Sequence, residues 1–197
     1  MNPPSPTVTV TDVLCDAYTR IHEELPPLLE GLDSETMLWR PDPDANSIAW
    51  LAWHLTRVQD DHVAGVGRVE QVWTGAGFAD RFALPYAVET IGYGHTTAEV
   101  EAFETADPGL LLGYHGAVHE LTMSVLDAMG DADYARVVDE RWDPPVTAAV
   151  RLVSVIGDAQ AHLGQIGYLR GLAERRSRGV SGCAAGPDSR DASRSRP

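Results

Sequence analysis

The 197-residue sequence contains no lysine and only two cysteines, Cys15 and Cys183. Neither cysteine has a CxxC neighbour, which argues against a disulfide framework and against a cysteine-based zinc site. No apolar run approaches the ~20 residues of a membrane-spanning helix, so we expect no membrane partner. The first residues, MNPPSPTVTVTD, lack the basic and apolar segments of a secretory signal, and we therefore expect a cytoplasmic protein.

Positive charge is scarce as well. The 15 arginines face 29 acidic side chains, which gives a formal net charge of −14. Six of those arginines follow residue 174, so the preceding part of the chain is more acidic still. Phosphate backbones bind through basic patches, and this composition argues against a nucleic-acid partner. Because arginine codons are GC-rich and lysine codons AT-rich, the absence of lysine indicates a high-GC genome.

Nucleophile and nucleotide motifs are also absent. The sequence has no GxSxG elbow, no phosphate-binding glycine loop ahead of a helix and no dinucleotide fingerprint. It contains no internal repeat. Any chemistry must therefore come from other side chains, and no catalytic residue is identified from motifs alone.

Apolar residues recur at helical spacing in four long segments, and no series of strands is evident. The predicted helices cover residues 11–31, 47–73, 110–129 and 147–174. We expect Pro26 and Pro27 to kink or interrupt the first helix, because a mid-helix proline removes a hydrogen bond. Asn46 or Ser47 caps the second helix.

Shorter features complete the prediction. A helical turn is expected at residues 34–38, and the third helix begins with a separate piece from Thr97 that is interrupted near residues 106–109. The fourth helix opens at Asp143 or at Thr147. Residues 74–97 contain four glycines and no sustained period, and such long connections often form a lid or a pocket wall.

Four long helices with loops between them predict an all-α four-helix bundle. We expect the bundle to occupy residues 11–174. Residues 1–10 form a flexible N-terminus, and residues 175–197 form a disordered tail rich in arginine, serine and glycine.

An acid and a histidine lie one turn apart in the apolar fourth helix. Asp158 and His162 have the i,i+4 spacing by which one helix offers two ligands to one metal ion. His54, on the border of the apolar face of the second helix, supplies the natural third ligand. Two histidines and one carboxylate with open positions are typical of a catalytic metal site. The alternative is a buried Asp–His hydrogen bond with no metal.

Other polar residues are candidates for supporting positions. Asp61, seven residues after His54, would accept a hydrogen bond from it or else lie in solvent. His115 and His119 form a competing i,i+4 pair on a more polar helix, and separately His115 or His119 is a candidate to face the central pocket. Trp142 precedes the ligand-bearing helix and is a candidate pocket residue. The lone histidines are expected at the surface or satisfied by local partners: His22, His62 and His95.

Three stretches together resemble the DinB-like superfamily, closest to its actinobacterial branch of mycothiol-dependent transferases and maleylpyruvate isomerases. They are SIAWLAWHLTRVQDDH (47–62), LLLGYHGAVHE (110–120) and RWDPPVTAAVRLVSVIGDAQAHLGQIGYLRGL (141–172). The resemblance implies an up-down-down-up bundle with one long crossover, which residues 74–97 suit. It also implies a divalent metal, usually zinc or nickel, held by residues of the second and fourth helices.

Carried over by position, the implied metal ligands are His54, Asp158 and His162. Many members have histidine where this chain has Asp158, and the maleylpyruvate isomerase branch has a carboxylate there. Members that act on low-molecular-weight thiols use the metal to hold a thiolate, and the thiol of high-GC actinobacteria is mycothiol. The resemblance thus implies a transferase that activates a small thiol for attack on a small electrophile.

Two other functions remain open at this stage. One is a metal-assisted isomerase or hydrolase of a small acid, for which Arg57 and Arg141 would bind the substrate. The other is a non-catalytic metal-binding bundle of the stress response. A homodimer is among the assemblies that exposed bundle faces allow.

Overall fold

The computed structural model describes residues 7–183, and the side chains through residue 178. Four long helices dominate this part of the chain. They are α1 (Val10–Leu29), α3 (Ile48–Gly67), α7 (Pro108–Asp127) and α9 (Ala148–Cys183). Among the helices of residues 7–183, none combines the length and the apolar character that crossing a bilayer requires.

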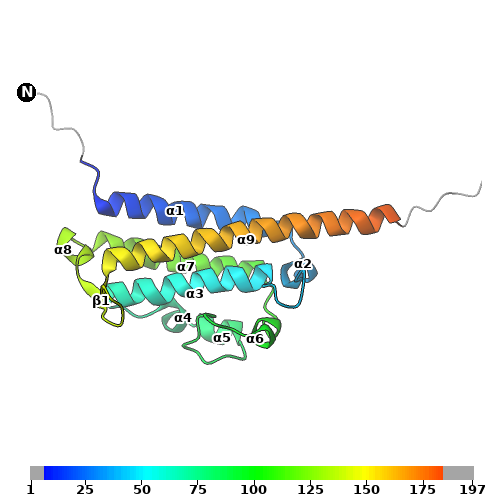
Figure 1. Cartoon of the computed structure of the whole chain (residues 1–197), viewed down its shortest axis with the longest axis horizontal. Coiled ribbons are helices and arrows are strands. Elements are labelled where there is room, and N and C mark those ends of the chain that lie inside the picture. Colours follow the sequence, from blue (N-terminus) through cyan, green and yellow to red (C-terminus); the bar gives the residue numbers. More distant parts are fainter. Residues whose placement is uncertain (1–6, 184–197) are drawn as a thin grey trace, which may run out of the picture.

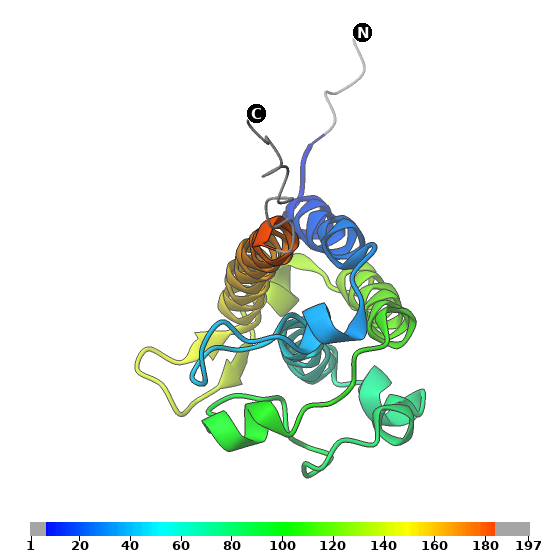
Figure 2. The same cartoon turned by 90° about the vertical axis from the view of Figure 1, so that its right-hand side faces the viewer.

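The four helices form a bundle with up-down-down-up order. In Figure 1, α1 and α9 run in one direction, and α3 and α7 run in the other. Both α1 and α3 pack against α7 and α9, and the end-on view in Figure 2 shows α1 opposite α3 and α7 opposite α9. Because α3 and α7 are parallel, the chain between them must return along the bundle, as the predicted crossover requires.

The first two helices largely follow the sequence prediction. Thr9 and Asp12 form a capping box that starts α1. The short helix α2 (Ser34–Leu38) lies where a helical turn was predicted. The prediction that Pro26 and Pro27 interrupt α1 is wrong in one respect, because the helix continues through them to Leu29. Both prolines lie in its last turn, where a break in the hydrogen-bond ladder costs little.

Helix α3 begins as predicted but is shorter than predicted. The Ser47 hydroxyl accepts a hydrogen bond from the Trp50 amide and caps the N-terminus. The helix ends at Gly67 rather than at residue 73, since Arg68 adopts the left-handed conformation with φ 55°. All residues from Ile48 to Asp60 are buried, because α7 and α9 pack against α3 and the crossover covers its remaining face (Figure 2).

The crossover is more helical than its glycine content predicts. It contains α4 (Val72–Gly75), α5 (Phe78–Phe82) and α6 (Thr97–Glu101). The piece predicted from Thr97 is α6, and Asp107 caps α7 with Pro108 at its first position. The irregular part of the crossover is therefore only the segment between α5 and α6. Helix α5 anchors its start through the buried side chains of Phe78 and Phe82.

A helical turn and a hairpin precede the last helix. Helix α8 (Asp131–Tyr134) is followed by an antiparallel pair, β1 (Val137–Asp139) and β2 (Val146–Thr147). No strand was predicted here. The pair is too short to show a period in the sequence, and its loop holds Trp142, Asp143 and Pro144.

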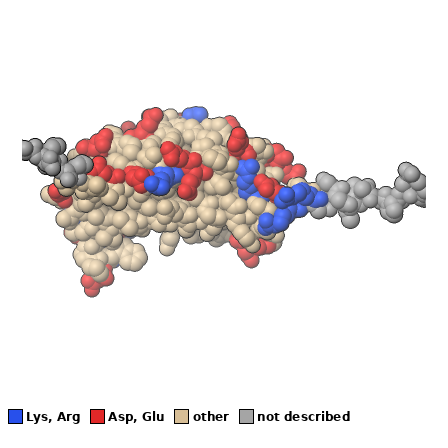
Figure 3. Space-filling view, turned by 90° about the horizontal axis from the view of Figure 1, so that it is seen from above, with Lys and Arg blue, Asp and Glu red and all other residues tan. Residues whose placement is uncertain are grey.

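Helix α9 begins at Ala148, next to the predicted Thr147, and extends to Cys183 instead of ending near residue 174. Its C-terminal part carries several of the chain's arginines, which gather at that end of the molecule in Figure 3. One of them, Arg170, donates to the Glu174 carboxylate one turn later, so i,i+4 pairing supports the polar extension. Residues 1–6 and 184–197 lie outside the described part of the chain, and the predictions made for them stay predictions.

Candidate metal centre

Three side chains from two antiparallel helices converge beside the core. His54 comes from α3, and Asp158 and His162 come from adjacent turns of α9. One ligand atom from each residue lies within 4.8 Å of the others. The His54 and His162 rings approach edge to face, with centroids 4.9 Å apart. The structure therefore brings together the three residues that the sequence nominated as metal ligands.

Both histidines are held in the tautomer that a metal ligand needs. His54 Nδ1 lies 2.5 Å from the carbonyl oxygen of Ile91, which can only accept a hydrogen bond. His162 Nδ1 lies 2.8 Å from Oε1 of Gln165. When Nδ1 carries the proton in a neutral ring, Nε2 keeps its lone pair. Each Nε2 atom is thus left free to bind a cation, with its ring orientation fixed from behind.

The carboxylate of Asp158 is short of partners. Its Oδ1 atom lies 3.5 Å from Nε2 of His162, beyond the usual N–H···O range. Its Oδ2 atom is buried and has no hydrogen-bond partner among the described residues. A carboxylate oxygen buried in this way is costly unless a cation or donor satisfies it. A divalent ion bound to both histidines and to Asp158 would satisfy it, so the residues present fit a metal.

The protonation of His54 and Asp158 agrees with this fit, whereas His162 holds its proton more tightly than a free imidazole. Burial lowers the pKa of His54 to about 4, against the smaller opposing effect of the Ile91 carbonyl. The ring is therefore neutral near pH 7, as ligation requires. Burial opposes ionisation of Asp158, but the nearby His162 and His54 rings outweigh it and lower the pKa of Asp158. Burial alone would lower the pKa of His162, yet the nearby Asp158 carboxylate and the hydrogen bond to Gln165 raise it, so a cation that binds here competes with a proton for this ring.

The crossover helps to fix the position of the His54 ring. Gly92, directly after Ile91, has φ +90°, and a Cβ atom there would lie 2.7 Å from Nδ1 of His54. Only glycine both adopts this conformation readily and lets the backbone approach the ring. On its other side, His54 stacks on Trp50 with centroids 4.6 Å apart. The contact between His54 and the Ile91 carbonyl was not predicted from the sequence. The glycines of this segment were the available signal, because glycine allows a backbone to approach another group closely.

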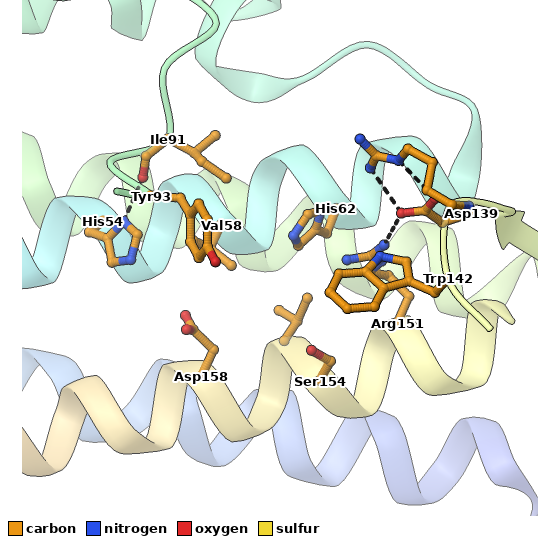
Figure 4. A pocket seen from close by; sticks show the side chains of 12 residues that line it. His54, Val58, His62, Ile91, Tyr93, Asp139, Trp142, Arg151, Ser154 and Asp158 are labelled. Atoms are coloured by element: carbon orange, nitrogen blue, oxygen red, sulfur yellow. Dashed lines mark hydrogen bonds and ion pairs between the residues drawn. The ribbon is translucent and has the colours of Figure 1, made fainter. Parts of the chain in front are cut away.

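A cavity of about 570 Å³ opens beside these residues. Figure 4 shows His54 and Asp158 at one end of it, and Asp139, Trp142 and Arg151 at the other. The wall between the two ends includes Val58. The pocket is thus formed by α3, α9, the crossover and the hairpin, and a metal at the triad would have an open side.

Two of the predicted supporting residues do not contact the triad. The first is Asp61, which accepts from Gln71 and pairs with His62, while Ile91 takes the place predicted for Asp61 beside His54. Although nearly in line with His54, Asp61 is two turns further on, ~10 Å along the axis, which is too far for a hydrogen bond.

The second is Arg57, which does not line the cavity either. It is completely buried and donates to the Thr90 carbonyl, to Gln71 and to Tyr114, with Asp60 3.6 Å away. The prediction that Arg57 binds substrate is therefore wrong. Its guanidinium instead joins α3 to the crossover and to α7.

The competing histidine pair lies elsewhere in the bundle. His115 is buried, with Nδ1 3.1 Å from the Thr56 hydroxyl, and does not face the cavity. His22 of α1 stacks on His119 with centroids 4.3 Å apart. His95 accepts from the Trp50 indole at Nδ1, but its buried Nε2 atom has no hydrogen-bond partner among the described residues, so it is only half satisfied.

The remaining pocket candidates do line the cavity. Trp142 and Arg141 lie in its wall, and so does His62, which was expected to be an ordinary surface or satisfied histidine. Sequence reasoning missed Arg151 and Tyr93. Arg151 had a usable signal, since it precedes Asp158 by seven residues and projects from the same face of the helix.

Comparisons with known proteins agree with the fold. A sequence model of the DinB superfamily matches residues 17–166. A solved structure, described as the conserved protein of locus from Enterococcus faecalis, is 33% identical, with a TM-score of 0.79. The match covers 85% of this chain and 98% of that one. No curated protein matches the chain.

Proposed function

The chain belongs to the DinB superfamily, and from that premise and the geometry of the triad we propose that it is a metal-dependent transferase of a small thiol. The ligands would be Nε2 of His54, a carboxylate oxygen of Asp158 and Nε2 of His162. Zinc or nickel would suit this donor set, because imidazole and carboxylate bind borderline divalent ions. The proposal thus includes both the binding of a divalent metal at the triad and the use of a small thiol as substrate.

One observation carries the proposal: a site with three protein donors that faces a cavity. Structural zinc sites are closed by four protein ligands, whereas catalytic sites keep a position for water or substrate. Within the described residues, no fourth acidic, histidine or cysteine side chain joins the three donors. Ile91 and Gln165 hold the two imidazoles from behind, as metal-binding histidines usually require.

A bound divalent ion would lower the pKa of a coordinated thiol and supply a thiolate near neutral pH. The protein's own residues orient that thiol and limit the access of water. Val58 and Val155 form an apolar wall next to Asp158 in the cavity. In the proposed reaction the sulfur forms a bond to an electrophilic carbon, a leaving group departs with its electron pair, and the thiol proton passes to solvent.

Mycothiol is the thiol we propose, since the lysine-free composition indicates the high-GC background in which it is used. The partners are then a small thiol and a small electrophile in the cytoplasm, with no nucleic acid and no membrane. A homodimer remains an expectation.

The first test is the metal content of untagged protein beside His162→Ala, measured by plasma mass spectrometry. About one zinc or nickel ion per chain, lost in the variant, is the result expected from a three-donor site. Mycothiol and a chlorobimane should then give a conjugate at a rate that falls on chelation and recovers with metal. No metal in either protein after divalent ions are added back would contradict the site. A conjugation rate unchanged by the chelator would contradict the reaction.

A second candidate function has one observation in its favour. Arg141 lines the cavity, as a metal-assisted isomerase or hydrolase of a small acid would require. Turnover of an acid without thiol would favour this function over transfer. Stoichiometric metal without turnover of any substrate would favour a binding protein of the stress response.

A further inference from the structure

We infer that the end of the cavity opposite the triad binds an anionic group, and that the ligand is an elongated acid whose other end reaches the metal. This inference rests on the proposed thiol-binding metal site and names the class of the electrophile, because mycothiol itself carries no carboxylate or phosphate. The residues that carry it are Arg151 of α9 and Arg141 of the hairpin loop, which line the same cavity as His54 and Asp158.

Arg151 is fixed at a definite distance from the triad. It precedes Asp158 by seven residues of α9, which places it two turns away on the same helix face, ~10 Å along the axis. Its side chain is 19% exposed, and its Nη2 atom donates to Oδ2 of Asp139 at 2.9 Å. Figure 4 shows Arg151 and Asp139 together at the end of the cavity away from Asp158.

Asp139 holds two arginines at once. It is buried, and besides Arg151 it accepts from Nε and Nη2 of Arg141, both at 2.9 Å. The hydrogen bonds from Arg141 keep the pKa of Asp139 well below its usual range, so the carboxylate stays charged. Two guanidinium groups and one carboxylate leave a net positive charge at this end of the cavity, in a chain whose formal net charge is −14.

The two arginines also keep donors for a ligand. A guanidinium has five N–H groups, and Asp139 accepts from one nitrogen of Arg151 and two of Arg141. No other side-chain hydrogen bond of either arginine occurs among the described residues. Planar, preoriented N–H groups of this kind suit carboxylate or phosphate oxygens. Asp139 therefore positions the two arginines and leaves several of their N–H groups available to a ligand.

The middle of the cavity suits an apolar chain between the two ends. Val58 and Val155 line it, and two aromatic rings stand at its rim. Tyr93 is 88% exposed and Trp142 is 65% exposed, although both rings are large and largely apolar. In Figure 4 they come from different segments, the crossover and the hairpin loop. Burial of these rings against a ligand would favour binding of an elongated molecule.

The test uses thiols of graded length on cobalt-loaded protein. The probes are ω-mercaptocarboxylates from short to long, each compared with the ω-mercaptoalcohol of the same length. The thiolate-to-cobalt absorption band reports binding at the metal end. At the length that spans ~10 Å, the acid should bind ~10- to 100-fold more tightly than the alcohol, as expected for hydrogen bonds to a charged group.

Arg151→Gln should remove the advantage of the acid and leave the affinity for the alcohol unchanged. Asp139 keeps its bidentate partner Arg141 in this variant, and bound cobalt and the melting temperature verify its fold. The matched control is Arg20→Gln, since Arg20 pairs with Asp16 on the exposed side of α1. If Arg151→Gln does not fold, the exposed Arg141→Gln takes its place and should reduce the same advantage.

The remaining outcomes separate this inference from the function on which it rests. Equal affinity of acid and alcohol at every length, with a normal thiolate band, overturns the anion subsite and leaves thiol binding intact. An advantage of the acid that does not depend on length also overturns it, because general electrostatic attraction has no preferred span. Cobalt that binds with no thiolate band for any probe overturns the proposed thiol function itself.

Discussion

His54 shows how a single side chain is prepared for metal binding. The Trp50 ring packs on one face, and the Ile91 carbonyl holds Nδ1. Burial keeps the ring neutral by lowering its pKa to about 4. The free Nε2 atom can then point only toward Asp158 and His162. At the residue scale, the contact that decides this orientation is the close approach of the backbone at Gly92.

Gly92→Ala should therefore weaken metal binding. A Cβ atom at this position would lie 2.7 Å from Nδ1 of His54, so the Ile91 carbonyl or the ring must move. Loss of such a supporting contact reduces metal affinity ~10- to 100-fold in other sites. The affinity is measured by competition with a chromogenic zinc chelator.

The matched control is Gly94→Ala. Gly94 also has a positive φ, +75°, but a Cβ atom there meets nothing within 4 Å. Both variants carry a similar backbone penalty of ~1 kcal/mol, and Gly94→Ala should keep its metal affinity. Equal affinities in the two variants would show that the close approach to His54 is not what supports the site.

Among the structural elements, the crossover depends on a buried polar cluster beneath it. Asp60 accepts from the backbone amides of Val72 and Trp73, at the start of α4, and from the Tyr114 hydroxyl of α7. Arg57, 3.6 Å away, donates to the Thr90 carbonyl just before Ile91. The cluster thus fixes both ends of the segment that places the Ile91 carbonyl on His54.

Asp60→Ala should lower the free energy of unfolding by ~3–5 kcal/mol, because removing one partner leaves the Arg57 charge buried without its partner. It should also loosen the crossover and weaken metal binding. Urea unfolding and amide hydrogen exchange of residues 72–92 measure the two effects. Asp61→Ala is the control, since Asp61 is partly exposed and pairs with His62, and it should cost no more than ~1 kcal/mol. Equal losses in the two variants would contradict the anchoring role.

The contact between α1 and α7 should respond to pH. Burial lowers the pKa of His115 from 6.5 to about 3. Between these values the unfolded chain binds the proton and the folded protein does not, so stability falls as the pH decreases. One such group contributes ~1.4 kcal/mol per pH unit in this window.

His115→Gln removes that group and should make the pH dependence shallower by this amount. Urea unfolding of both proteins, freed of metal, between pH 7 and pH 5 measures the difference. Parallel curves would show that His115 is not the group responsible, whatever the variant does to stability at pH 7.

At the scale of the whole molecule, the triad ties α3 to α9, two helices that pack side by side in the bundle. A ligand that binds only the folded state stabilises it by mass action. Zinc at one hundred times its dissociation constant should add ~2.7 kcal/mol. For a chain of this size that corresponds to a rise of ~5–11 °C in Tm.

The rise should disappear in His54→Ala and in His162→Ala, and a chelator should reverse it in the wild type. His119→Ala is the control, because His119 belongs to the other i,i+4 pair and stacks on His22. Loss of the shift in His119→Ala alone would place the metal between α1 and α7 instead. Scanning calorimetry with and without zinc makes the comparison.

The sequence by itself determined the helices and the faces they present. Helical periodicity and a cap such as Ser47 are local, so the four long helices and the short α2 could be predicted. The pairing of Asp158 with His162 is local too, since i,i+4 residues share a helix face. His54 could be predicted as the third ligand because a histidine on a strongly apolar helix face needs a polar partner in the core.

Only the tertiary structure decided what surrounds these residues. The path of the crossover placed Ile91, and not Asp61, beside His54. It also covered Arg57, which is buried in contact with Asp60 and Tyr114. Both outcomes depend on packing between segments more than thirty residues apart, which no local pattern encodes. The hairpin likewise brought Asp139 to Arg151. Helix faces follow from the chain's own period, whereas the partners across a cavity follow from how the loops close over it.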